Sequence, residues 1–238
     1  MARGRRPRFT DRSTVAAGRG SPTGRRRQQT DFPYVEISGR HSMNIVSTSA
    51  TISEQIELNL GGRTPDISVI IGPTGIGKTD RAVNIARRDD APATCIDRYQ
   101  VFPELASGTG RPTSDELPGT ERIYLAERKI ADGELSARDA VSSLSEIVRD
   151  VSRRSDKLIL EGGSTSLCTL LFESGVLDHP HVTVRFITAP DWSAYRQRVR
   201  NREVRLLEGN PEQAPMPAEL AAVRRTPQQL NFVESIVG

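Results

Sequence analysis

The sequence contains little cysteine, little histidine and few aromatic residues. Its 238 residues include 2 cysteines and 3 histidines, and aromatic residues make up 5%. Cys95 and Cys168 lie far apart in apolar stretches, which indicates two buried reduced thiols and neither a disulfide framework nor a zinc site. His41, His179 and His181 also lack the spacing of metal ligands.

Long apolar runs are absent as well. No stretch approaches the roughly 18 consecutive apolar residues of a membrane span, and the N-terminus lacks the apolar run of a secretory signal. We therefore expect a cytoplasmic protein without a membrane partner. Trp192 is the one tryptophan, and at the start of a helix it is expected to be a packing residue.

Net positive charge is confined to the N-terminus. The net charge is +3, but residues 1–30 hold nine arginines and one acid, Asp11, so that the remaining residues carry −5. No basic patch for nucleic acid is evident beyond residue 30, and no nucleic-acid partner is expected.

Residues 1–64 are predicted to form a basic, mostly disordered N-terminal extension. Residues 1–30 have almost no apolar side chains to offset the entropy cost of ordering. This segment is either an RNA-binding or transit-like arm, or a non-functional extension, since Met43 is a plausible internal start. Residues 31–64 are ambiguous, with a short strand expected at Ile56–Leu60.

From Asp66 onward, short β-branched runs alternate with amphipathic segments. This alternation predicts an α/β fold, a P-loop NTPase-like parallel sheet with helices on both faces. The expected strands are Ile67–Ile71, Ala93–Ile96, Leu158–Leu160 and Val182–Ile187, and the expected helices are Thr79–Arg88, Thr120–Ile130, Ser136–Arg153 and Trp192–Glu208.

The segment Gly72–Thr79 has the pattern of a phosphate-binding P-loop. Gly72, Gly75 and Gly77 let the backbone curl so that successive N–H groups face phosphate oxygens. Lys78 supplies a mobile positive charge, and the hydroxyl of Thr79 is a ligand for Mg²⁺. The following helix adds the positive end of its dipole. The motif therefore predicts a site for a di- or triphosphate-like group.

Asp97 follows the second predicted strand, at the edge where open α/β sheets bind ligands. Its carboxylate would hold Mg²⁺, act as a base, or only cap a turn. A P-loop kinase or NTPase, with Glu161 as the metal-positioning acid, stays open at this point.

With its surroundings, the sequence resembles the adenylate isopentenyltransferases (adenylate dimethylallyltransferases) of cytokinin biosynthesis, in particular the bacterial members. The resemblance covers about residues 66–238. The related tRNA isopentenyltransferases usually differ after the aspartate, where this chain has Arg98-Tyr99. The stretches that carry the resemblance are the P-loop, Ile96-Asp97-Arg98 with Gln100, Gly108–Thr113, Glu116-Leu117 with Gly119-Thr120 and Tyr124-Leu125, Leu160–Leu167, Pro190-Asp191, and Arg198 with Arg202.

The resemblance implies transfer of the dimethylallyl group of dimethylallyl diphosphate to N6 of an adenine nucleotide, with AMP as the expected acceptor and Mg²⁺ as cofactor. Asp97 would be the base. Thr74 would donate to the bridging oxygen of the leaving group, and Lys78 and Arg202 would contact the diphosphate. Thr109, Gly163, Ser164 and Thr165 would join Asp97 in binding the acceptor nucleotide.

The C-terminus departs from the family pattern. Family members normally continue past Gly238 through a further helical segment, so residues 65–238 are expected to be a P-loop isopentenyltransferase domain truncated at its C-terminus. Val237 is apolar where some members carry an acid, which favours dimethylallyl over a hydroxylated donor. A monomer is expected. A tRNA dimethylallyltransferase and an inactive truncated homologue remain alternatives beside the kinase.

Overall fold

The computed structural model describes residues 34–38, 64–189 and 191–224, with residues 34–38 described by their backbone alone. Most of the predicted N-terminal extension therefore lies outside the described residues. The same holds for the strand expected at Ile56–Leu60, for His41 and for Val237.

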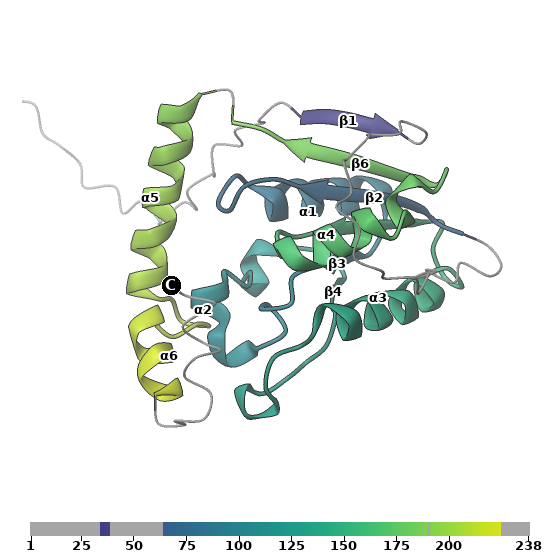
Figure 1. The fold of residues 1–238 in the computed structure, drawn as a ribbon. Coiled ribbons are helices and arrows are strands. Elements are labelled where there is room, and N and C mark those ends of the chain that lie inside the picture. Colours follow the sequence, from purple (N-terminus) through teal and green to yellow (C-terminus); the bar gives the residue numbers. More distant parts are fainter. Residues whose placement is uncertain (1–33, 39–63, 190, 225–238) are drawn as a thin grey trace, which may run out of the picture. The chain divides into compact units, whose positions relative to one another are not determined.

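A six-stranded sheet organises the described chain, in the order β1-β6-β2-β5-β3-β4 (Figure 1). Neighbouring strands from β6 to β4 run parallel, and β1 pairs antiparallel with β6. The four predicted strands are confirmed, with ends that differ by no more than a residue. The strands are β1 (Tyr34–Ser38), β2 (Asp66–Ile71), β3 (Ala93–Cys95), β4 (Arg122–Tyr124), β5 (Lys157–Glu161) and β6 (Val182–Ile187).

Helices cover both faces of the sheet, as the sequence predicted (Figure 1). Alternate side chains of a strand point to opposite faces, so each strand contributes to two apolar clusters. One cluster joins Val69 and Leu160 to α3 (Ala137–Val151) and α4 (Thr165–Glu173). The other joins Ile70 and Ile159 to α1 (Lys78–Asp89), through Ala82, Ile85 and Ala86.

The helix predicted at Thr120–Ile130 is wrong. Residues Arg122–Tyr124 form β4, which pairs in parallel with β3, and only Ile130–Asp132 form a 3₁₀ turn. Ile123 and Tyr124 are residue types that favour strands, and the pairing with β3 outweighs the helical spacing. The side chain of Arg122 is 3% exposed and forms an ion pair with Glu161, which ties this edge strand to the sheet.

The chain after the sheet forms two helices, α5 (Trp192–Glu208) and α6 (Met216–Val223). The prediction of α5 is confirmed to the residue, and Asp191 caps it by accepting hydrogen bonds from the N–H groups of Ser193 and Ala194 at 2.8 and 3.1 Å. Neither α6, α4 nor the short α2 (Ala106–Thr109) was predicted. Within the described ranges no helix is long and apolar enough to cross a membrane.

Candidate active site

The P-loop links β2 to α1, which is the context that the motif requires. Gly75 and Gly77 have φ values of 75° and 105°, in the left-handed region that favours glycine. A Cβ at Gly72 would lie 2.7 Å from the carbonyl oxygen of Ile187. The ammonium group of Lys78 donates to the carbonyl oxygens of Gly72 and Pro73, at 2.9 and 3.0 Å, so the side chain bends back over the loop.

Helix α5 holds the P-loop from the other side. Arg198 donates from Nε to the carbonyl oxygen of Gly75 at 3.0 Å and from Nη2 to Asp80 at 2.5 Å. Its Nη2 also lies where a Cβ at Gly77 would approach within 2.6 Å. The hydroxyl of Tyr195 donates to the carbonyl oxygen of Thr74 at 2.8 Å. The backbone of the loop is thus fixed by side chains from a distant part of the sequence.

Glu161 ends β5 beside the first turn of α1. Its side chain is 2% exposed, and Arg122 of β4 donates to Oε1. Although burial disfavours the charged guanidinium, the adjacent carboxylate raises the pKa of Arg122 above its ordinary value. The hydroxyl of Thr79 lies 3.4 and 3.5 Å from the two oxygens of Glu161, which is long for a hydrogen bond.

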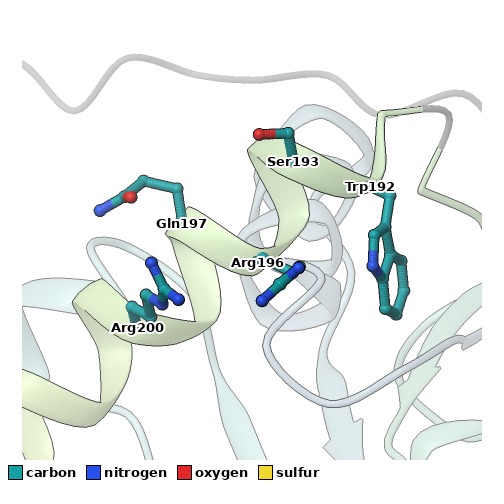
Figure 2. A pocket seen from close by; sticks show the side chains of 5 residues that line it. All are labelled: Trp192, Ser193, Arg196, Gln197 and Arg200. Atoms are coloured by element: carbon teal, nitrogen blue, oxygen red, sulfur yellow. The ribbon is translucent and has the colours of Figure 1, made fainter.

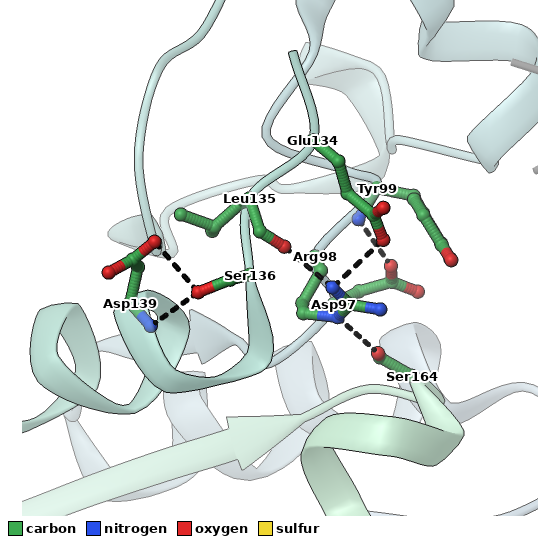
Figure 3. A network of polar contacts seen from close by, with 8 residues as sticks. All are labelled: Asp97, Arg98, Tyr99, Glu134, Leu135, Ser136, Asp139 and Ser164. Atoms are coloured by element: carbon green, nitrogen blue, oxygen red, sulfur yellow. Dashed lines mark hydrogen bonds and ion pairs between the residues drawn. The ribbon is translucent and has the colours of Figure 1, made fainter. Parts of the chain in front are cut away.

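Asp97 follows β3 at the same edge of the sheet. The N–H of Tyr99 donates to its Oδ1 at 2.9 Å (Figure 3). Burial raises the pKa of Asp97 above its ordinary value, and the charge of Glu161 raises it further, while the hydrogen bond from Tyr99 and the charge of Lys78 act the other way. A carboxylate with raised proton affinity suits a general base.

Two cations face this edge of the sheet. Burial lowers the pKa of Lys78, and the nearby charge of Arg202 lowers it further against the opposing charges of Glu161 and Asp97. Burial also lowers the pKa of Arg202, with a further contribution from Arg205. Within the described chain the guanidinium of Arg202 makes no hydrogen bond or ion pair. A bound anion would relieve the repulsion between Lys78 and Arg202.

Arg98 connects Asp97 to the rest of the site (Figure 3). Its side chain is buried, and Nη1 donates to the carbonyl oxygen of Leu135 at 2.6 Å and to Glu134 at 3.0 Å. Nε lies 3.4 Å from the hydroxyl of Ser164, the residue that precedes α4. The guanidinium therefore bridges the end of β3, the start of α4 and the segment before α3.

The residues predicted to bind the acceptor take different positions. A Cβ at Gly163 would lie 3.3 Å from Nζ of Lys78, so this glycine adjoins the P-loop. Ser164 is buried and Thr165 is exposed at the start of α4. The hydroxyl of Thr109 donates to the carbonyl oxygen of Leu105 at 2.8 Å, within its own helical turn. Gly163 therefore lies beside Lys78. The hydroxyl of Thr109 instead donates its hydrogen bond within its own segment of the chain.

A separate hollow of about 460 Å³ lies along α5 (Figure 2). None of its lining residues belongs to the P-loop or to the Asp97 edge. Trp192 is 65% exposed there, with its ring 5.3 Å from that of Tyr195, so its prediction as a packing residue is wrong. The lining residues are Trp192, Ser193, Arg196, Gln197 and Arg200.

Several residues of the site were missed from the sequence. Glu161 was considered as the metal-positioning acid of a kinase and as part of the Glu161–Ser166 stretch that would hold the acceptor, and its ion pair with Arg122 was not foreseen. Arg122 was not identified because its segment was predicted to be a helix and not the strand β4. Arg98 was noted only as a motif residue. For the contacts of Arg198 and Tyr195 with the P-loop no sequence signal exists, because they depend on where α5 packs.

The fold and the site together define a P-loop α/β protein in which a buried carboxyl, Asp97, lies at the same sheet edge as the P-loop and the cations Lys78 and Arg202. The chain belongs to the isopentenyl transferase family, whose model matches residues 65–238. The resemblance found from the motifs is therefore confirmed, and the P-loop kinase is set aside.

Known relatives agree with this assignment. The chain is 36% identical over 171 residues to an adenylate dimethylallyltransferase of Ralstonia nicotianae, covering 71% of this chain and 72% of that protein. It is 34% identical over 177 residues to one of Agrobacterium tumefaciens, covering 72% and 71%. A solved tRNA isopentenylpyrophosphate transferase from Staphylococcus epidermidis matches 45% of this chain and 34% of that chain, at 27% identity and a TM-score of 0.42. That likeness is too slight to bear on the fold.

Proposed function

We propose that this chain transfers the dimethylallyl group of dimethylallyl diphosphate to N6 of AMP, releasing diphosphate and N6-isopentenyl-AMP. One observation carries the proposal. The P-loop follows β2 and Asp97 follows β3, and both strands run parallel to β5 between them, so a carboxyl that would accept a proton and a loop that would hold a diphosphate lie at one sheet edge. The family assignment and the two relatives supply the reaction class.

The diphosphate of the donor would occupy the P-loop. Backbone N–H groups of the Gly72–Thr79 loop and the start of α1 would face its oxygens. To bind it, Lys78 would exchange its bonds to the carbonyls of Gly72 and Pro73 for phosphate oxygens. Arg202 would supply the second cation, and Thr74 a hydrogen bond to the bridging oxygen. These groups stabilise the charge that grows as the carbon–oxygen bond breaks.

The residues present fit a magnesium ion held largely by the diphosphate. The hydroxyl of Thr79 and the carboxylate of Glu161 offer hard oxygens 3.4 and 3.5 Å apart. Mg²⁺ prefers such ligands together with phosphate oxygens and water. The described residues contain no group of three His, Cys, Asp or Glu side chains that would hold a metal alone. When bound, the ion would neutralise charge on the departing diphosphate.

The acceptor nucleotide would approach Asp97 with its exocyclic amine. The N6 lone pair is delocalised into the adenine ring, so the amine becomes a nucleophile only as it loses a proton. Asp97 would accept that proton while the new carbon–nitrogen bond forms. Gly163, Ser164, Thr165 and the Thr109 loop would hold the nucleotide, and the shared edge of the sheet would align both substrates.

The test is a direct assay of the full chain with dimethylallyl diphosphate, AMP and Mg²⁺. Mass spectrometry should detect N6-isopentenyl-AMP, with one diphosphate released per product. ADP, ATP and a hydroxylated donor in parallel reactions measure the substrate preference. The proposal fails if the wild-type protein binds both substrates and yields no product. Phosphate release from ATP without a prenyl donor would also contradict it.

A further inference from the structure

A buried carboxylate of α6 binds the backbone of the short helix α2. Oε1 of Glu219 accepts a hydrogen bond from the N–H of Ser107 at 2.7 Å, and Oε2 accepts one from the N–H of Gly108 at 2.8 Å. Glu219 is 6% exposed, and more than one hundred residues separate it from its partners. One side chain thus satisfies two successive N–H groups of a helix start, which have no partner within their own helix.

The segment before α6 extends this contact along the same loop. The hydroxyl of Ser107 donates to the carbonyl oxygen of Ala214 at 2.6 Å, and the amide of Gln213 donates to the carbonyl oxygen of Arg111 at 2.7 Å. At the exposed end, the N–H of Ser114 donates to Glu212 at 2.8 Å. Residues 212–219 therefore contact residues 107–114 at several points, and Glu219 is the buried one.

The loop held in this way borders the candidate active site on two sides. Its Gly110 lies against the guanidinium of Arg202. Its Arg111 donates to the carbonyl oxygen of Gln100 at 3.0 Å, three residues after Asp97. A shift of α2 would therefore be transmitted to both ends of the site.

An ionised carboxylate is a costly choice for this contact. Burial raises the pKa of Glu219, and the N–H groups of Gly108 and Ser107 oppose that shift. An apolar side chain would avoid the desolvation but leave the buried N–H of Ser107 and the partly buried N–H of Gly108 unpaired. The carboxylate, unlike a glutamine, accepts from both N–H groups at once, which fixes the loop rather than only filling space.

We propose that Glu219 is a positioning residue for the acceptor nucleotide, which it serves by fixing residues 106–111 beside Asp97 and Arg202. The proposal rests on the proposed function, in which this loop contributes Thr109 to the acceptor site. Glu219 does not touch the reacting atoms. Its removal is expected to weaken nucleotide binding more than it slows the chemical step.

Glu219→Gln tests the proposal, because glutamine keeps the size but offers one acceptor and turns an N–H donor toward the other amide. We expect the KM for AMP to rise about tenfold with kcat within about twofold, and the KM for dimethylallyl diphosphate to rise by a smaller factor, because Gly110 of the same loop contacts Arg202. Glu219→Asp keeps the charge and shortens the reach, and it should give an intermediate KM. Glu208→Gln, at the exposed end of α5, is the charge-matched control and should behave as wild type.

Amide hydrogen exchange gives a readout that does not depend on activity. The amides of Ser107 and Gly108 should exchange slowly in the wild type and at least about tenfold faster in Glu219→Gln, while the amides of β5 stay protected. Equal losses in both KM values and kcat, or unchanged exchange at Ser107 and Gly108, would overturn the positioning role. Loss of the wild-type reaction itself would overturn the proposed function, while the exchange result would still stand.

Discussion

The guanidinium of Arg202 occupies the space that a side chain at Gly110 would need. A Cβ at residue 110 would overlap Nη2 of Arg202, and φ at Gly110 is +67°. Two constraints therefore favour glycine at position 110: the left-handed backbone conformation and the close approach of Arg202. Because Arg202 is the second cation proposed for the diphosphate, the contact links the α2 loop to the donor site.

Gly110→Ala is expected to displace Arg202 and weaken donor binding. The KM for dimethylallyl diphosphate should rise about tenfold or more, as for loss of one charge-assisted hydrogen bond. Gly119→Ala is the matched control, since Gly119 has a φ of +63° and no atom within 4 Å of its added Cβ. Both variants should lose about 1 kcal/mol of stability from the left-handed backbone. Steady-state kinetics and urea unfolding distinguish them, and equal kinetics in both would contradict the role of the contact.

Asp97→Asn is expected to abolish transfer and preserve binding of the donor. Loss of a general base typically lowers the rate by about 10²- to 10⁴-fold. Asparagine also removes a buried charge whose pKa is raised by burial, so the variant should unfold at equal or higher urea concentration at neutral pH. Calorimetric titration with inorganic diphosphate and Mg²⁺ measures the binding. If binding were lost in parallel with activity, Asp97 would instead act on the metal.

The pH dependence of the wild type should report the same carboxylate. The base acts when ionised, so activity is full above the raised pKa of Asp97 and falls as the pH drops through it. The charge of Lys78 lowers that pKa, and a bound diphosphate would offset this charge. The acid limb of kcat, measured with both substrates bound, should therefore lie at higher pH than that of kcat/KM. Coincident limbs would argue against the electrostatic link between Lys78 and Asp97.

Arg122→Met should be strongly destabilising, because it leaves the buried carboxylate of Glu161 without its partner. Breaking a buried ion pair typically costs about 3–5 kcal/mol. The side chains of this pair are 3% and 2% exposed. The double variant Arg122→Met with Glu161→Gln should recover much of the loss in urea unfolding. Arg154→Met removes a pair with Glu121 that is 41% and 52% exposed, and it should cost less than about 1 kcal/mol.

Arg98→Lys should lower kcat without a comparable loss of stability. A lysine keeps the charge but has one ammonium group in place of the fork that reaches Leu135, Glu134 and Ser164. We expect kcat to fall about tenfold as Asp97 and the start of α4 lose their common support. Glu134→Gln, which alters only the partly exposed end of this network, should leave kcat within about twofold. A similar fall in both variants would mean that Glu134, not the fork, matters.

The parallel core of the fold was predictable because its strands are short apolar runs, and β2 and β5 end directly before a glycine. The P-loop and Asp97 were found for the same reason, since their chemistry follows a strand end directly. The edge strand β4 was not predicted, because its residues also fit a helical spacing. Only the pairing with β3 decides between a helix and a strand there. Local sequence does not contain that partner.

The buried charged residues that support the site could not be predicted from the sequence for a similar reason. Arg122 and Glu219 act on groups far along the chain, and a lone charged residue in a sequence is typical of a solvated surface. Both are buried, with partners 39 and more than one hundred residues away. Whether a charge is buried depends on which elements pack together, and that is known only from the assembled fold.

Strand β1 has a consequence for the length of the expressed chain. A product that began at Met43 would lack residues 34–38, whose backbone pairs with β6 from Val182 to Ile187. The outer edge of β6 would then present unpaired N–H and C=O groups along a β-branched strand, which is a template for edge-to-edge aggregation. A chain that began at Met43 would keep the P-loop and Asp97, but it would be more prone to aggregate through this exposed strand edge.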